Sequence, residues 1–135
     1  MQANVLWQHE PQPFAGTDKI LHSDRRHELG QFFTADPIAE FMASLFRDYG
    51  QDVNLLDAGA GAGALSAALV RHFCRQARRP KRISLTAFEV DPLMLPLLRT
   101  NLEQCTQACR AAGMAFSAIV FNNRGYFRCQ NKVIR

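Results

Sequence analysis

The stretch VNLLDAGAGAG, residues 53–63, decides the fold. It begins as a short apolar run, 53–56, which Asp57 and a cluster of alternating glycines bring to a stop. Apolar residues then recur at the spacing of one helix face, at Leu65, Leu69 and Phe73. An apolar run followed by glycines and an amphipathic segment is typical of a strand, a tight turn and a helix. The stretch therefore predicts a strand–turn–helix unit.

A helix is predicted before this unit. Asp36 and Pro37 have the pattern of an N-cap followed by proline in the first turn, and Gly50 is expected to end the helix. Four apolar residues lie at the spacing of one helix face: Ile38, Phe41, Met42 and Leu45.

The residues after the unit repeat the alternation of strand and helix. A β-branched and aromatic stretch predicts a strand over 83–90, leucines at helical spacing predict a helix over 95–113, and 115–121 is predicted to be a third strand. Strands alternating with helices of this length imply right-handed crossovers and a parallel sheet. The fold class is therefore predicted to be α/β, with about three strands.

Length and composition describe one soluble domain. The chain has 135 residues, of which 47% are hydrophobic and 21% are charged, and both values are ordinary for a globular domain. No apolar run approaches the ~18 residues of a membrane span, and the first residues lack the pattern of a signal peptide. A cytoplasmic protein without a membrane partner is therefore expected. The four cysteines and four histidines lack ligand spacing, so neither a metal site nor a disulfide is expected.

The net charge of +4 is matched by the four cations of residues 122–135, a predicted basic tail that holds no acid. Residues 71–82 are a second basic segment, with six cations and no acid. Cations suit a helix C-terminus, so 71–82 is interpreted first as a solvated cap and loop, and second as a nucleic-acid contact. Residues 1–28 lack periodicity and are predicted to be a leader or arm.

The glycine turn favours a nucleotide-type ligand. Glycines at the carboxyl end of a parallel strand let the backbone approach a ligand closely, and either a dinucleotide or S-adenosylmethionine fits such a turn. Asp57 would repel a pyrophosphate but can bind the ammonium of S-adenosylmethionine, so the latter is favoured and a dinucleotide-dependent oxidoreductase is disfavoured. Glu89, after the second predicted strand, can accept both ribose hydroxyls of either cofactor. Asp91 is interpreted as an ordinary charged strand end.

Three segments together resemble a known family. They are GQFFTA at 30–35, LDAGAGAG at 56–63 and FEVDP at 88–92. They resemble the N-terminal segment of the adenine-N6 DNA methyltransferases of restriction-modification systems, over roughly residues 25–103. The resemblance implies a partial class I, Rossmann-like methyltransferase sheet, with the S-adenosylmethionine-binding half at 29–121 and DNA as the partner.

The resemblance also implies roles for single residues. Phe33 and Thr34 would line the methionine end of the cofactor pocket, although Ala35 replaces the family's usual proline. The glycine motif and the ribose-binding acid would be Asp57, Gly59, Gly61, Gly63 and Glu89. Asn122 stands where the family has an acid that meets the adenine ring of the cofactor.

The family's catalytic motif, N-P-P-aromatic, is absent from this sequence, because all six prolines are single and none follows Asn. A premature end of the chain is therefore expected, and no catalytic residue is assigned. The alternatives are a natural short protein and a non-enzymatic module that binds nucleic acid or a methyltransferase partner. If the sheet ends after its third strand, the resemblance implies that 53–56 is an open edge. We therefore expect a marginally stable or aggregation-prone chain, inactive alone, whose partner is the missing C-terminal half or another subunit.

Overall fold

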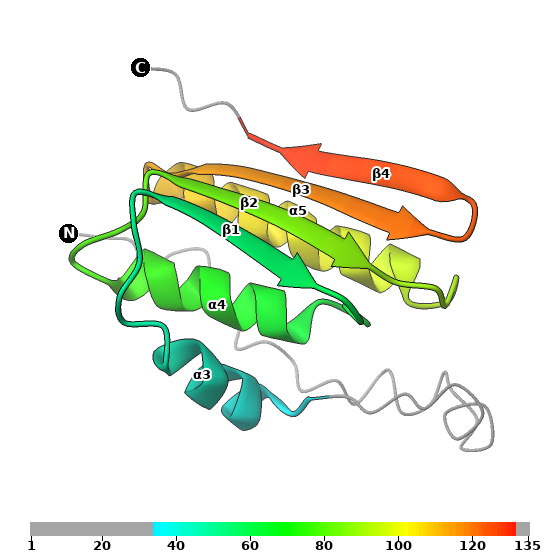
Figure 1. Cartoon of the computed structure of the whole chain (residues 1–135), viewed down its shortest axis with the longest axis horizontal. Coiled ribbons are helices and arrows are strands. Elements are labelled where there is room, and N and C mark those ends of the chain that lie inside the picture. The colour runs from blue at the N-terminus through cyan, green and yellow to red at the C-terminus, as the bar shows by residue number, and fades with distance from the viewer. Residues whose placement is uncertain (1–33, 132–135) are drawn as a thin grey trace.

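A computed structural model describes residues 34–131 of the chain (Figure 1). The predicted leader, Phe33 and the last four residues lie outside the described part. The elements follow in the order α3 (Asp36–Ser44), β1 (Asp52–Asp57), α4 (Ala64–Arg75), β2 (Arg82–Phe88), α5 (Leu95–Ala111), β3 (Ala115–Asn122) and β4 (Gly125–Gln130). No helix among these residues is long and apolar enough to cross a membrane.

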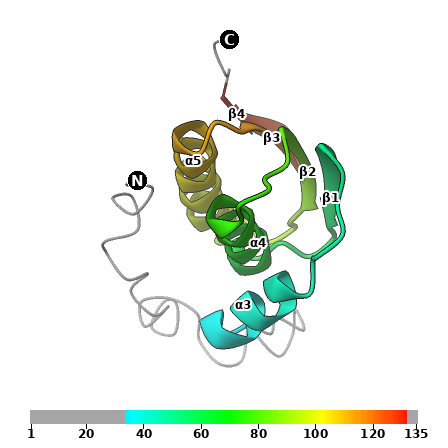
Figure 2. The same cartoon turned by 90° about the vertical axis from the view of Figure 1, so that its left-hand side faces the viewer.

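The strands form one sheet in the order β1-β2-β3-β4. The β1–β2 and β2–β3 pairs are parallel, whereas β3 and β4 pair antiparallel. Figure 2 shows α4 and α5 against one face of the sheet, while no described element covers the other face. The predicted α/β class and parallel sheet are confirmed. β1 lies at the edge of the sheet, as expected for residues 53–56.

Alternation along the central strands builds the core. Ile83, Leu85 and Ala87 of β2 are buried on the helix side, and the residues between them are more exposed. Phe73 of α4 and Leu98 of α5 are fully buried against this face. The period of two in the strands and the apolar face of each helix therefore place one core between the sheet and the helix pair.

The fourth strand was not predicted. Residues 125–130, interpreted as part of a basic tail, pair with β3 through a tight turn in which Gly125 has φ 140° and Asn122 Oδ1 accepts the Arg124 N–H at 2.8 Å. Asn131 anchors the end of β4, because its Oδ1 accepts the Phe116 N–H at 2.7 Å. Its Nδ2 donates to the carbonyls of Thr106 and Met114 at 3.1 and 3.2 Å. Half of the basic tail is thus part of the sheet.

Helix α3 differs from the prediction in length and in orientation. It ends at Ser44 rather than at Gly50, and its buried residues are Ala39 and Ala43. The predicted apolar face is open: the exposed fractions are 56% for Ile38, 65% for Phe41, 43% for Met42 and 58% for Leu45. Small side chains let α3 approach α4 closely, and an ion pair between Glu40 Oε1 and Arg71 Nε at 2.7 Å fixes the contact.

The cysteines lie at the contacts of α5 with its neighbours. Cys105, Cys109 and Cys129 are buried, Cys74 is partly buried, and all four are free thiols. Burial raises the pKa of Cys105 to about 12. A hydrogen bond from Cys109 lowers the pKa of the Cys74 thiol, and the charges of Arg79 and Arg75 lower it further. The same hydrogen bond, together with burial, raises the pKa of Cys109.

Thiol labelling of the native chain near pH 8 is therefore expected to modify Cys74 first, and Cys105 and Cys109 much more slowly. A shift from the ordinary 9.0 to about 12 lowers the thiolate fraction of Cys105 by roughly 1,000-fold. Since unfolding restores the ordinary value, the unfolded chain loses this proton first, and the free energy of unfolding should fall as pH rises from 9.0 to about 12. Mass spectrometry of timed samples measures the order, and labelling in denaturant is the control. Equal rates in the native chain would contradict this assignment.

Candidate functional site

Three predicted site residues lie at one edge of the sheet. Asp57 ends β1, Glu89 directly follows β2, and Asn122 ends β3. Because these strands are parallel and in register, with Asp57 opposite Ala87 and Phe88 opposite Phe121, their carboxyl ends meet at the same edge. This is the edge at which open α/β sheets bind ligands.

The glycine turn crosses this edge between β1 and α4. Gly61 and Gly63 have φ values of 53° and 88°, which L side chains rarely adopt. Two contacts hold the turn to its neighbours: Ala60 N–H donates to the Phe88 carbonyl at 3.0 Å, and Asn101 Nδ2 of α5 donates to the Ala62 carbonyl at 2.6 Å. The turn is therefore fixed by β2 and α5, far from it in the sequence.

Glu89 connects the turn to the end of β2. Its side chain is buried, with 7% of the residue exposed. Oε2 accepts the Gly61 N–H at 2.6 Å and Oε1 accepts the Asp91 N–H at 2.7 Å. A buried carboxylate is tolerated only when it is hydrogen-bonded, and two backbone donors meet that need here. Each carboxylate oxygen can accept a further hydrogen bond, so Glu89 can also accept from hydroxyl donors of a ligand.

Asp57 lies at the end of β1, directly before the turn. Its Oδ2 accepts the hydroxyl of Ser66, in the first turn of α4, at 2.7 Å. Ser66 is 5% exposed, whereas Asp57 is only partly buried, so the carboxylate keeps a route to solvent. Asp57 and Glu89 thus place two acidic side chains at a turn of small residues. Such an arrangement suits a ligand that carries both hydroxyls and a positive charge.

Asn122 lines a small cavity of about 160 Å³, whose lining residues are Val90, Pro92, Leu95, Asn122, Asn123 and Arg124. Three of these residues are apolar, and the amide of Asn122 can donate as well as accept a hydrogen bond.

The three predicted glycines of the turn differ in the space around them. Gly59 and Gly61 face open space, since a Cβ built on either would meet no atom within 4 Å. Gly63 lies against α5, where a Cβ would approach Leu98 Cδ1 to 2.9 Å. Thr34 lies just before α3, and no hydrogen bond within residues 34–131 joins it to Asp57 or Glu89.

Three residues that contribute to this edge of the sheet were not predicted from the sequence. They are Ser66 and Asn101, described above, and Asp91, which is 2% exposed and accepts the Leu93 N–H at 3.0 Å through Oδ1. Asp91 therefore orders the turn into α5 and is not an exposed strand end. Ser66 and Asp91 lie close to predicted residues in the chain, but no local pattern marks Asn101, which acts 39 positions from its partner.

The basic segment 71–82 is largely engaged within the fold. Arg71 and Arg75 pair with Glu40, Arg82 Nη1 lies 3.5 Å from Asp52 Oδ1, and Arg79 donates to the carbonyls of Gln76 and Ala112. Most of its cations thus hold neighbouring elements, which favours the cap-and-loop interpretation over a nucleic-acid contact. Within the described part of the chain, no group of three or more His, Cys, Asp or Glu residues can hold a metal ion.

No family model matches the chain. It is 37% identical over 99 residues to the type II methyltransferase M.PstI of Providencia stuartii, which covers 73% of this chain and 18% of that protein. It is 37% identical over 78 residues to the type II methyltransferase M.BsuBI of Bacillus subtilis, which covers 57% of this chain and 15% of that protein.

The chain is also similar to a solved structure, a modification subunit of a putative type I restriction enzyme from Vibrio vulnificus YJ016. The TM-score is 0.48 at 23% identity, over 65% of this chain and 20% of that one. The chain spans less than a fifth of the length of the curated relatives it matches. Within that span, the resemblance to methyltransferases of restriction-modification systems is confirmed, and the chain is related to a part of them.

Proposed function

We propose that residues 29–121 are the S-adenosylmethionine-binding half of a site-specific DNA adenine-N6 methyltransferase. The buried Glu89 at the end of β2, hydrogen-bonded to the glycine turn, is the observation that carries the proposal. The similarity to type II methyltransferases supports it, since such enzymes need a methyl donor. We further propose DNA as the substrate and the cytoplasm as the location.

The site residues fit this cofactor. Glu89 would hold the ribose hydroxyls, and Asp57 would hold the ammonium of the methionine part, beside a turn with open space at Gly59 and Gly61. Asn122 would bind the edge of the adenine ring, in the small cavity beside Val90. The cofactor supplies an activated methyl group on a sulfonium, whose positive charge suits the acidic surroundings.

The glycine turn makes close approach of the cofactor possible. Side chains at Gly59 and Gly61 would fill the open space in front of the turn, and the positive φ of Gly61 excludes most other residues. Phe33 and Thr34, by the family resemblance, would close the methionine end. Gly61 N–H, which donates to Glu89 at 2.6 Å, would keep the carboxylate oriented toward the ribose. Each of these residues binds or orients the cofactor, and none is proposed to take part in the methyl transfer.

Transfer to adenine needs further residues. A flipped base must be held so that its exocyclic nitrogen faces the methyl carbon, which the N-P-P-aromatic motif accomplishes in the family that this chain resembles. The sequence contains no such motif. We therefore propose that the chain binds the cofactor but does not methylate DNA by itself.

Titration calorimetry of the purified chain with S-adenosylmethionine tests the binding proposal. Saturable heat is expected for the native chain, and Asp57→Ala should weaken it by about tenfold, because one charge-assisted contact is lost. Asp48→Ala, at an acid remote from the turn, is the matched control. Absence of heat from a chain that is folded by circular dichroism would refute cofactor binding.

The proposed inactivity is tested by incubating the chain with DNA and labelled S-adenosylmethionine. Incorporation of labelled methyl groups into DNA above background would refute inactivity.

A further inference from the structure

Helices α4 and α5 run side by side in the same direction. Each connects two parallel strands of the sheet, and Figure 2 shows both against the same face. At their first turns, a Cβ built on Gly63 would lie 2.9 Å from Leu98 Cδ1. Cys74 lies eleven residues after Gly63, and Cys109 lies eleven residues after Leu98. Because that spacing is about three helical turns on each helix, the two cysteines face each other near the helix ends.

Contacts between the two helix ends agree with this register. The thiols of Cys74 and Cys109 are hydrogen-bonded to each other. Just beyond them, Arg79 Nη1 donates to the Ala112 carbonyl at 3.4 Å, which joins the chain after α4 to the end of α5. Cys74 also packs against the hydrophobic core to which Cys109 belongs. The two thiols therefore meet at the end of the helix pair that is remote from the glycine turn.

The other two cysteines are less suited to pair with Cys109. Cys105 lies on the same helix, where Cβ atoms four residues apart are separated by about 5–6 Å, whereas a disulfide needs about 3.5–4.5 Å between them. Cys129 of β4 lies beside Glu103, earlier on α5. The packing of α4 on α5 therefore selects Cys74 as the partner of Cys109.

The two thiols differ in access and in charge. Cys74 is partly buried, whereas Cys109 is fully buried. The hydrogen bond from Cys109 lowers the pKa of the Cys74 thiol, and the positive charges of Arg79 and Arg75 lower it further. These cations offset the helix C-terminus, which by itself disfavours a negative charge. An accessible thiol beside cations, with a second thiol in contact, is typical of redox-sensitive cysteine pairs.

We propose that Cys74 and Cys109 react with peroxides and close into a reversible disulfide between α4 and α5. With hydrogen peroxide, the Cys74 thiolate attacks one oxygen, the O–O bond breaks, and Cys74 becomes a sulfenic acid. The other oxygen leaves as hydroxide and takes up the proton that the Cys74 thiol had released. The Cys109 sulfur then attacks the Cys74 sulfur, so that the S–S bond forms and the S–O bond breaks. The departing hydroxide takes the Cys109 proton, so two thiols lose two electrons and one peroxide becomes two water molecules.

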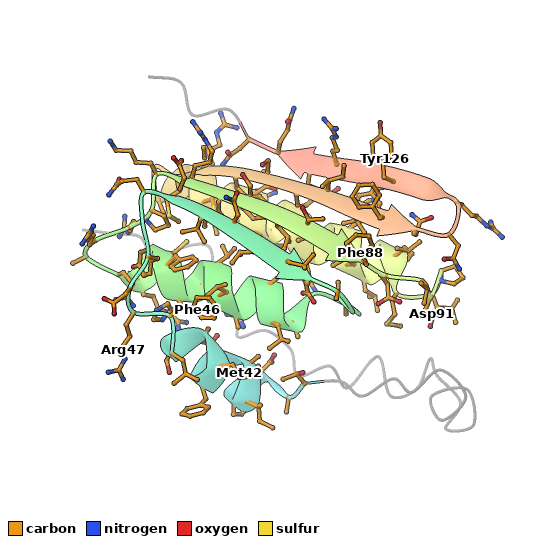
Figure 3. All side chains as sticks on the ribbon, in the orientation of Figure 1. Met42, Phe46, Arg47, Phe88, Asp91 and Tyr126 are labelled. Carbon is orange, nitrogen blue, oxygen red and sulfur yellow. The ribbon has the colours of Figure 1, made fainter. Side chains whose placement is uncertain are left out.

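The experiment treats the reduced full chain with hydrogen peroxide, blocks the remaining thiols in denaturant, and maps the peptides by mass spectrometry. A cross-link between the peptides of Cys74 and Cys109 is expected, with the loss of two hydrogen atoms, and dithiothreitol should reverse it. Met42 of α3 is 43% exposed (Figure 3) and serves as the internal measure of oxidation. Its sulfoxide needs a dedicated reductase and should persist in dithiothreitol.

Three variants separate the roles of the cysteines. Cys109→Ser should lose the cross-link and leave Cys74 as a sulfenic acid, which dimedone traps. Cys74→Ser should lose the cross-link without forming a sulfenic acid at Cys109, because that thiol is fully buried. Cys105→Ala, one turn before Cys109 on the same helix, is the matched control and should form the cross-link as the native chain does.

Other outcomes overturn the inference. It is wrong if the folded native chain forms no cross-link while Met42 is oxidised, or if the cross-link joins other cysteines or two chains. It is also wrong if the same pair forms as fast in denaturant, where the helices no longer hold it. These results come from the native chain, so they do not depend on whether a variant folds. No S-adenosylmethionine is present, so the outcome is independent of the proposed function.

Discussion

Glu89→Ala is expected to lower the affinity for S-adenosylmethionine by about 100-fold. The substitution removes both carboxylate oxygens that would accept the ribose hydroxyls, and each hydrogen bond to a charged group contributes about 1.5 kcal/mol or more. It also leaves the N–H groups of Gly61 and Asp91 without their acceptor, so the turn that carries the site loses its connection to β2. Titration calorimetry measures the affinity.

Glu89→Ala should also lower the free energy of unfolding. Urea unfolding measures this loss separately from the loss of cofactor affinity. The unpaired donors cost about 1–3 kcal/mol each where they remain buried. Glu103→Ala, at an exposed acid of α5, is the control and should change neither quantity. Glu89→Gln tests the two carboxylate oxygens separately. Its amide keeps one acceptor oxygen and places an NH2 group opposite the other backbone donor. If Glu89→Ala bound the cofactor as tightly as the native chain, ribose recognition at this residue would be excluded.

Gly63→Ala is expected to lower the free energy of unfolding by about 2–5 kcal/mol. A left-handed conformation costs an L side chain about 1–2 kcal/mol, and Gly63 has φ 88°. Its new Cβ would lie 2.9 Å from Leu98 Cδ1, and Leu98 is fully buried. The leucine must therefore shift within a packed core, which costs about 1–3 kcal/mol.

Gly59→Ala is the matched control for this prediction. Gly59 belongs to the same turn, but its φ is not positive and a Cβ there would meet no atom within 4 Å. Its effect on stability should be below about 0.5 kcal/mol. Chemical unfolding followed by circular dichroism compares the two variants. Equal losses at the two positions would show that neither the backbone conformation of Gly63 nor its contact with Leu98 limits the turn.

The α/β fold could be predicted because local signals agreed with it. The apolar run at 53–56, the alternating glycines and the leucines of α4 each specify one element, and their order specifies parallel pairing. The fourth strand could not be predicted from the same rules, because its cations suggested a tail. Its place depends on pairing with β3 and on the contacts of Asn131, which are tertiary.

The orientation of α3 could not be predicted either. The spacing of Ile38, Phe41 and Leu45 correctly indicates a helix, but it does not identify which face packs. Ala39 and Ala43 allow close approach to α4, and the ion pair of Glu40 with Arg71 lies on that same side. At the site, the predicted strand ends identified the acidic residues. The contact by which Asn101 of α5 holds the turn could not be predicted, because it joins residues that are far apart in the sequence.

The contact of Asn101 with the glycine turn has a consequence for protein engineering. Because α5 both packs the core through Leu98 and holds Ala62 through Asn101, stability and the proposed cofactor affinity would share one set of residues. Substitutions that repack α5 to raise the melting temperature would displace the turn and alter affinity at the same time. Selection for stability alone would therefore constrain the cofactor affinity, and selection for affinity alone would constrain stability. The residues at which one can be improved without the other are those of β4 and the outer side of α3.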